Sequence, residues 1–380
     1  MSDAAASTAD AARVSTLELF FDLVFVFTIT QLTTVLVDEP TVRGVGQAAL
    51  MLGLIWWMYA GYAWLTNAVA PDSSGRRFLL LGGMAGFLVI ALSIPGAFDG
   101  SGAAFGIAYL AVVLVHFGMF SRASSQTVVQ AVLGLARSNL VTALLVLAGG
   151  IAGGTARYVL WTLGFLGEWV VTRFTTPRGF EVEPGHFVER HGLVVIVAIG
   201  ESVVAIGIGS AGLAVDVELV AVAVLGLLLS ACLWWAYFGL GDDDRAERAM
   251  AAAAPGRRFL MGFDGFGVWH MPILLGIIAA AAGLKKAIGH PGDELHTAQA
   301  LQLGGGVALF MLGDLLFRRA LGLGGARWRA VALVAALATV PLGLAVSAAA
   351  QLAALVLVTA GALAAEASAH GAQHARRPPV

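Results

Sequence analysis

Charged residues are scarce in this chain, at 12% of the sequence, against about 25% in an ordinary soluble domain. Hydrophobic residues make up 59% of its 380 residues, and the mean hydropathy is +0.85. So few polar side chains cannot cover a surface that faces water. The composition therefore excludes a soluble globular protein. It predicts an all-α, polytopic transmembrane helix bundle whose main partner is the lipid bilayer.

Cysteine is also nearly absent, since Cys232 is the single one and lies within an apolar run. This excludes a disulfide framework and a cysteine-rich metal site. The net charge of -2 provides no basic field for nucleic acid. The sequence contains no HExxH motif, P-loop, strand-associated GxGxxG motif or nucleophile elbow. We therefore expect no enzyme activity, no cofactor, no bound metal and no nucleic-acid partner.

Apolar runs long enough to cross a bilayer recur along the whole chain, each bounded by glycine, proline or charged residues. We predict twelve spans, near residues 17–37, 45–66, 78–97, 103–120, 138–154, 156–173, 190–211, 217–239, 262–283, 299–317, 328–348 and 350–368. Pro341 is expected to kink the eleventh span, because proline removes a helix hydrogen bond.

The basic residues are distributed unevenly across these predicted loops. If the N-terminus is cytoplasmic, 18 of the 22 Lys and Arg residues fall in or near cytoplasmic segments. The other side keeps only Arg43, Arg157, Lys285 and Lys286. Cytoplasmic loops of membrane proteins carry such an excess of basic residues. We therefore expect a multi-pass protein of the cell (inner) membrane with both termini in the cytoplasm.

Two motifs occur twice in the same order, which indicates an internal repeat. Residues 56–61 read WWMYAG and residues 234–239 read WWAYFG, while GRRFL occurs at both 75–79 and 256–260. An even number of spans returns the chain to its starting side, so six-helix halves would be parallel repeats. The predicted order is a cytoplasmic tail over 1–16, a first repeat over 17–174, a cytoplasmic linker over 175–189, a second repeat over 190–368 and a cytoplasmic tail over 369–380.

The repeat aligns acidic residues of the two halves. It places Asp22 against Glu201 and, more loosely, Glu168 against Glu366. Placing a carboxylate at the centre of a bilayer costs roughly 2.5–3.5 kcal/mol on insertion scales, so each such residue is expected to have a structural or functional role that offsets this cost. We predict that Asp22 and Glu201 face each other near the midplane and bind a proton or cation. The alternative is that either carboxylate only caps or pairs helices.

Further candidate residues lie close to these two acids in the sequence. Glu18 is four residues before Asp22 and shares its helix face, although it is near enough to the helix end to sit at the interface. Ser202 follows Glu201, and His191 lies at the start of the same span. Next to His191, Glu189 and Arg190 favour an interfacial charge cluster.

The ninth span is predicted to be interrupted. Residues 262–267 read GFDGFG, and His270 and Pro272 follow, so glycines and a proline weaken this helix. Interrupted helices line cavities in many transporters. Asp264 and His270 are therefore predicted to face a polar pathway. Otherwise Asp264 is an interfacial cap and His270 a core histidine with satisfied hydrogen bonds.

Other charged groups have simpler interpretations. Asp314 is four residues before Arg318, a spacing that predicts a local ion pair. Glu366, His370 and His374 have helical spacing that a metal would accept, but a mobile polar tail is the favoured interpretation.

Two segments carry a resemblance to a known family. Residues 17–32, LELFFDLVFVFTITQL, and residues 188–207, VERHGLVVIVAIGESVVAIG, resemble the bacterial low temperature requirement protein A (LtrA) family. The resemblance covers most of the chain and implies a multi-pass membrane protein, without a settled activity. The first segment also resembles, more loosely, the first helix of potassium channels that carry a Phe-Ser-Asp motif. Phe21 stands in place of the serine, and the second repeat lacks the motif.

Taken together, these features favour an LtrA-type secondary transporter of a small solute or ion. The candidate pathway residues are Glu18, Asp22, His191, Glu201, Ser202, Asp264 and His270. The expected ligand is a proton, a cation or a small solute. An ion channel and a non-transport structural or stress-related membrane protein are the alternatives, and a homo-oligomer is left open.

Overall fold

The computed structural model describes residues 14–68, 71, 73–120, 126–174 and 182–375 of the chain. Most of the predicted N-terminal tail, the first part of the predicted linker and the last five residues lie outside this part. The basic residues Arg13, Arg122, Arg178, Arg376 and Arg377 therefore lie outside it as well, and so does the side chain of His374.

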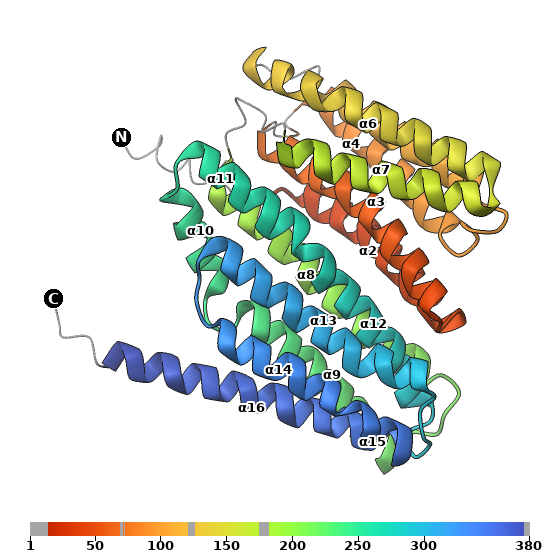
Figure 1. Cartoon of the computed structure of the whole chain (residues 1–380), viewed down its shortest axis with the longest axis vertical. Coiled ribbons are helices and arrows are strands. Elements are labelled where there is room, and N and C mark those ends of the chain that lie inside the picture. Colours follow the sequence, from red (N-terminus) through yellow and green to blue (C-terminus); the bar gives the residue numbers. More distant parts are fainter. Residues whose placement is uncertain (1–13, 69–70, 72, 121–125, 175–181, 376–380) are drawn as a thin grey trace. The chain divides into compact units, whose positions relative to one another are not determined.

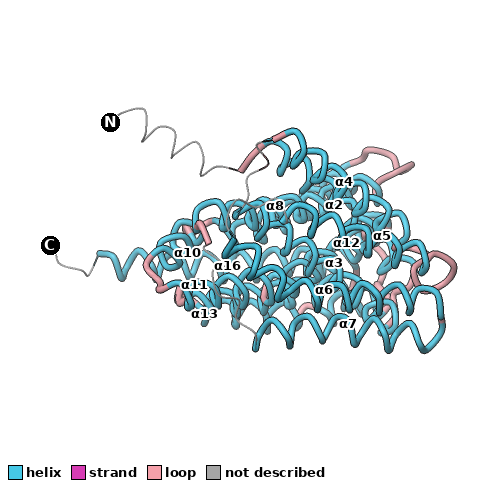
Figure 2. Tube along the Cα trace, turned by 90° about the horizontal axis from the view of Figure 1, so that it is seen from above, coloured by secondary structure: helices cyan, strands magenta, loops and turns pink. Residues whose placement is uncertain are grey.

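Helices account for nearly all of the described residues, which contain no β-strand (Figure 2). Their bounds are α2 Thr16–Asp38, α3 Val42–Ala68, α4 Ser74–Ser93, α5 Gly102–Phe120, α6 Gln126–Ala152, α7 Gly154–Phe174, α8 Pro184–Gly209, α9 Val217–Phe238, α10 Asp242–Ala251, α11 Pro255–Met261, the π-helix η1 Gly262–Val268, α12 His270–Gly289, α13 Thr297–Leu321, α14 Ala326–Ala338, α15 Val340–Ala345 and α16 Ala348–Ala375.

Ten helical segments of the described chain are long and apolar enough to cross a membrane, and a shorter apolar segment covers 136–152. The all-helical, multi-pass membrane class predicted from the sequence is therefore confirmed. Helix α7 is not among the ten, and it contains Arg157, Glu168 and Arg173. Each of the twelve predicted runs coincides largely with helix in the structure, but the number of twelve spans stays a prediction.

Two irregular helices occur where glycine and proline predict them. The ninth run begins with the π-helix η1, where a side chain at Gly265 would collide with Leu321. In the eleventh run, α14 ends at Ala338 and α15 begins at Val340, with Pro341 in its first turn. Both predicted interruptions are confirmed. The polar helix α10 lies between the predicted eighth and ninth spans, and its sequence DDDRAERAMA contains no apolar run that would predict a spanning helix.

The first of two compact units contains residues 14–35, 42–194 and 250–263 of the described chain. Within it α4 packs on α5, α5 on α6 and α6 on α7, and Figure 1 shows α6 and α7 side by side. Its core is rich in aromatic side chains, such as Phe25 and Tyr59, whose ring centroids are 4.3 Å apart. Aromatic rings at such distances adopt preferred relative orientations, and these contacts stabilise the core of the unit.

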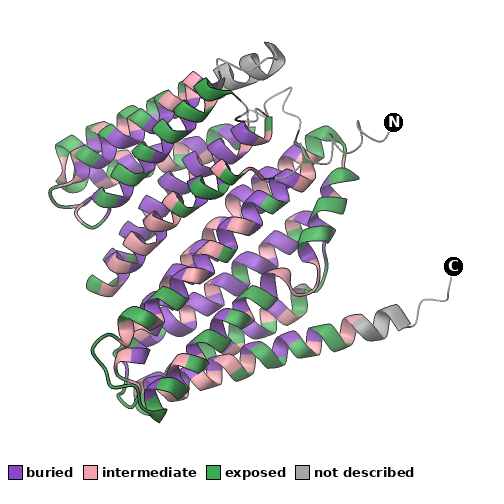
Figure 3. Ribbon diagram, turned by 180° about the vertical axis from the view of Figure 1, so that it is seen from behind, coloured by how far each residue is buried: buried purple, intermediate pink, exposed green. Residues whose placement is uncertain are grey.

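The second unit contains residues 36–41, 195–249 and 264–375 of the described chain. Its most extensive helix pair is α12 with α13, and α14 and α9 each pack against α16. A side chain at Gly276 would come within 2.5 Å of the Phe310 backbone nitrogen, so glycine allows the α12 and α13 backbones to approach closely. Figure 3 shows buried and exposed residues alternating along the helices, and large apolar residues such as Leu357 are exposed, as a lipid-facing surface requires.

Candidate functional site

A fully buried arginine joins two carboxylates in the first unit. Arg190 lies near the start of α8 and is 0% exposed. One guanidinium nitrogen, Nη1, is 3.2 Å from Glu18 Oε1, and Nη2 is 3.0 Å from Asp22 Oδ1. The guanidinium also lies over the rings of Phe21 and Tyr59, 5.5 and 5.8 Å from their centroids. A buried cation requires such a set of partners, because its desolvation is costly.

The two carboxylates come from one face of α2, because they are four residues apart. Glu18 Oε2 accepts hydrogen bonds from the Ser15 backbone N–H at 2.9 Å and from its hydroxyl at 2.8 Å. Asp22 Oδ1 accepts a hydrogen bond of 2.7 Å from the Tyr59 hydroxyl on α3. Three helices, α2, α3 and α8, therefore position this group of side chains.

His186, one turn before Arg190, completes the group. Its Nε2 is 3.2 Å from Glu18 Oε1, and its Nδ1 is 3.3 Å from the Asn67 amide nitrogen. Asn67 is oriented by Glu183, since its amide nitrogen donates to the Glu183 carbonyl and its oxygen accepts from the Glu183 N–H. His186 Nδ1 therefore acts as an acceptor, and Nε2 carries the proton directed at Glu18. This is the neutral form of histidine.

We call Glu18, Asp22, Tyr59, His186 and Arg190 the Arg190 cluster. It contains two carboxylates and one arginine, besides the tyrosine and the histidine. With both carboxylates ionised, its net charge is one negative unit. Asp22 Oδ2 is buried and accepts no hydrogen bond from the described residues. A buried oxygen of this kind is a place where a proton or a cation would be stabilised.

A second buried ion-pair group lies in the second unit and has a different charge balance. Arg318 pairs with Asp242 and, at 3.0 Å, with Glu366. We call this group, whose members are Asp242, Asp314, Arg318, Arg329 and Glu366, the Arg318–Arg329 network. In it Arg329 Nη1 is 2.9 Å from Glu366 Oε2, and Arg329 also pairs with Asp314.

The charges of this network are compensated. Arg329 donates a further hydrogen bond of 2.7 Å to the Ala236 carbonyl, and Asp242 is also paired with Arg245 at 2.8 Å. With Arg245, which lies outside the five named members and is 22% exposed, three carboxylates meet three arginines. Each carboxylate is paired, so the network has the properties of a structural connection between α9, α10, α13, α14 and α16.

Two expectations about these residues are wrong. Asp314 pairs with Arg329 on the following helix, and Arg318 turns instead to Asp242 and Glu366. Glu366 is buried between the two arginines, so it does not belong to a mobile polar tail. Sequence spacing identified the near neighbour of Asp314, but the loop at 322–325 reverses the chain and brings Arg329 to it.

Comparison with known proteins identifies the family. The family model described as bacterial low temperature requirement A protein (LtrA) matches residues 13–364. The chain belongs to the LtrA family. It is also 29% identical over 328 residues to an uncharacterized protein of Rhizobium meliloti (strain 1021), covering 82% of this chain and 78% of that protein. The match includes the whole Arg190 cluster, and the membrane class of this LtrA protein agrees with its apolar helices.

The structure brings together two of the predicted pathway residues of this LtrA protein, Glu18 and Asp22. His191 follows Arg190 in the sequence and is buried, but its Nδ1 is 2.8 Å from the Phe187 carbonyl of its own helix, and its ring lies against Trp56. Arg190 is fully buried and its neighbour Glu189 is exposed, and their position at the membrane interface stays a prediction.

The other predicted residues lie in the second unit. Glu201 and Ser202 are buried on α8, and Asp264 is half-buried on η1. His270 is buried, with Nδ1 2.9 Å from the Gly265 carbonyl and Nε2 2.7 Å from the Tyr237 hydroxyl. Since a carbonyl only accepts, Nδ1 carries the proton and Tyr237 donates to Nε2. Asp22 is in the first unit and Glu201 in the second, and their facing each other stays a prediction.

Sequence reasoning missed His186 and Tyr59. A signal for each was present. His186 and Arg190 are four residues apart and so share a helix face, and Tyr59 lies within the repeated WWMYAG motif. Another buried acid, Glu168 on α7, has the hydroxyls of Ser138 and Thr142 beside it and no ion pair with a basic residue in the described part of the chain.

Proposed function

We propose that this LtrA protein is a secondary transporter of a small solute or ion in the cell (inner) membrane, and that the Arg190 cluster binds a proton or small cation during transport. The observation that carries the proposal is the buried Asp22 Oδ2, which accepts no hydrogen bond from the described residues. No catalytic reaction is assigned to the protein.

The charge of the cluster supports this role. Arg190 holds Glu18 and Asp22 through one guanidinium, so one carboxylate charge is left without a cation. A proton on Asp22 Oδ2 or a monovalent cation beside it would neutralise the cluster. A buried group with two accessible charge states can change its occupancy during a transport cycle, whereas a fully compensated ion pair cannot do so without breaking.

His186 gives the cluster a second place for a proton. Its Nδ1 accepts from Asn67, and protonation there would oppose the Asn67 amide donor while strengthening attraction to Glu18. Proton entry at His186 would therefore move Asn67, which is bonded to Glu183 just before α8.

The wider architecture follows from the sequence repeat and is part of the proposal. We propose twelve spans arranged as two parallel six-helix repeats, with both termini in the cytoplasm. The cluster is near the starts of α2 and α8, so this orientation places it toward the cytoplasmic side. Glu201 is the sequence counterpart of Asp22, and we assign Glu201, Ser202, Asp264 and His270 to the continuation of the route.

Proton movement in proteoliposomes tests the proposal. The purified protein would be reconstituted with a pH-sensitive dye inside, and outward gradients of K⁺, Na⁺ and Li⁺ would be imposed in turn. We expect the wild type to move protons with one of these cations and Asp22→Asn to abolish the movement. Glu189→Gln is the matched control, because it removes an exposed carboxylate next to Arg190.

Two results would contradict the proposal. One is a wild type that moves no protons with any of the cations, and the other is an Asp22→Asn variant that retains the wild-type rate. Single-channel currents in planar bilayers would instead support an ion channel, since transporter turnover is too slow to give them.

A further inference from the structure

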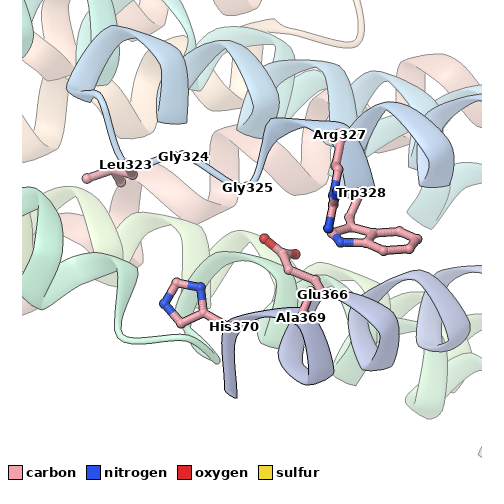
Figure 4. Close-up of a pocket in the computed structure, with 8 residues that line it drawn as sticks. All are labelled: Leu323, Gly324, Gly325, Arg327, Trp328, Glu366, Ala369 and His370. Atoms are coloured by element: carbon pink, nitrogen blue, oxygen red, sulfur yellow. The ribbon is translucent and has the colours of Figure 1, made fainter. Parts of the chain in front are cut away.

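A cavity of about 420 Å³ opens in the second unit, between the loop that joins α13 to α14 and the last turns of α16 (Figure 4). Neither the Arg190 cluster nor the proposed transport route includes it. Its lining residues are Leu323, Gly324, Gly325, Arg327, Trp328, Glu366, Ala369 and His370.

The charge of this cavity favours an anion. Glu366 is the one carboxylate in the described lining, and its two oxygens are paired with Arg318 and Arg329 at 3.0 and 2.9 Å. Its negative charge is therefore compensated within the Arg318–Arg329 network. Arg327 is outside that network and exposed, so it adds a positive charge that no ion pair within the described residues cancels.

Hydrogen-bond donors surround the same space. The Arg327 guanidinium lies over the Trp328 ring, 5.2 Å from its centroid, and Figure 4 shows the two side chains next to each other. The Trp328 indole N–H is buried and donates to no acceptor in the described chain. An indole nitrogen can only donate, so this group requires an acceptor that the described residues do not provide.

The loop backbone is suited to a close approach. Gly324 and Gly325 have φ angles of 77° and 73°, and a side chain at Gly325 would collide with Glu366 and Arg318. Directly after them α14 begins, a helix of 13 residues. The first N–H groups of a helix lack partners within it and carry a partial positive charge. Arg327 and Trp328 belong to this first turn of α14, so its N–H groups and the two side chains lie at the same end of the helix.

We propose that this cavity binds a phosphate-bearing anion. Arginine binds phosphate oxygens with two parallel hydrogen bonds, and the indole N–H supplies a third donor. The volume lies in the range of ordinary small-ligand pockets. Phosphate could be supplied by the headgroup of an anionic lipid or by a free phosphorylated solute, and basic pockets at helix ends bind lipid headgroups in other membrane proteins.

The experiment uses the full chain in detergent. Retained lipid is measured by native mass spectrometry after incubation with phosphatidylglycerol or phosphatidylcholine, and binding of inorganic phosphate is measured by thermal shift against chloride at equal ionic strength. The variants are Arg327→Ala and Trp328→Phe. Arg319→Ala is the matched control, because Arg319 is also exposed near the same loop but does not line the cavity.

We expect phosphatidylglycerol or inorganic phosphate to bind, with Arg327→Ala weakening the affinity roughly tenfold or more. Trp328→Phe should weaken it roughly threefold to tenfold, and Arg319→Ala less than about twofold. Binding of phosphatidylglycerol alone identifies a lipid headgroup as the ligand, and binding of both identifies the phosphate itself. The proposal is overturned if neither probe binds, if phosphatidylcholine binds equally well, or if Arg319→Ala and Arg327→Ala have the same effect.

Discussion

The Arg318–Arg329 network provides a sharp test of how buried charge stabilises this LtrA protein. The perturbation is Glu366→Gln, which keeps the shape of the side chain and removes its charge. Glu366 bridges Arg318 and Arg329 at 3.0 and 2.9 Å, and all three side chains are 3% exposed or less. Loss of the bridging charge leaves both arginines with too little compensation.

The magnitude follows from the remaining partners. Breaking a buried ion pair by removing one partner costs about 3–5 kcal/mol. Arg318 keeps Asp242 and Arg329 keeps Asp314, so the lower end, about 3 kcal/mol, is expected. At about 2–4 °C per kcal/mol for a unit of this size, the apparent Tm should fall by roughly 6–12 °C.

Thermal unfolding in detergent, followed by tryptophan fluorescence, measures this change. The comparator is Glu168→Gln, which alters the predicted repeat counterpart of Glu366. Glu168 is equally buried but has no basic partner in the described chain. Its substitution therefore leaves no arginine without a carboxylate and should change the apparent Tm by less than about 3 °C. Equal effects of Glu366→Gln and Glu168→Gln would refute the argument that charge compensation holds the second unit together.

Three further changes have defined outcomes. Arg190→Gln should destabilise the first unit by about 3–5 kcal/mol, and adding Asp22→Asn should recover part of that loss. A double-mutant cycle of unfolding midpoints measures this, and a coupling energy within experimental error would contradict the pairing of Arg190 with Asp22. Tyr237→Phe leaves His270 Nε2 without its donor and should cost about 1–3 kcal/mol in denaturant unfolding, whereas an unchanged midpoint would contradict the assigned hydrogen bond. Gly276→Leu should separate α12 from α13 and cost about 1–3 kcal/mol or more in the same assay, and a neutral result would mean that the two helices are not so closely packed.

The helices could be predicted from the sequence because lipid imposes a strong constraint on the backbone. Every polar backbone group inside a bilayer must be bonded within the chain, so an apolar run of about 20 residues is read as a helix. The interruptions at η1 and at Pro341 were predictable for a similarly local reason. Helix α10 was not, because it is polar and short, and its position depends on the pairing of Asp242 with Arg318.

The candidate site was only partly predictable. Glu18 and Asp22 could be found because carboxylates in an apolar run are conspicuous and share a helix face. Their partners could not, since Tyr59 and Arg190 are separated from Asp22 by many residues and hydropathy provides no information about helix pairing. The full burial of Arg190 was not predictable, because an arginine near a helix end ordinarily extends its charge to water. Its burial depends on two carboxylates from α2, a tertiary effect.

The buried arginines also sharpen the argument for orientation. The cytoplasmic tally of 18 basic residues includes Arg190, Arg318 and Arg329, which are buried in ion pairs and are not loop charges. Removing these three from 18 leaves 15. On the other side, Arg157 is buried and donates to backbone carbonyls such as that of Ala97, so removing it from four leaves three. The asymmetry therefore remains when the buried charges are left out, and it agrees with the proposed cytoplasmic termini, since an excess of basic residues in cytoplasmic loops determines the orientation of membrane proteins.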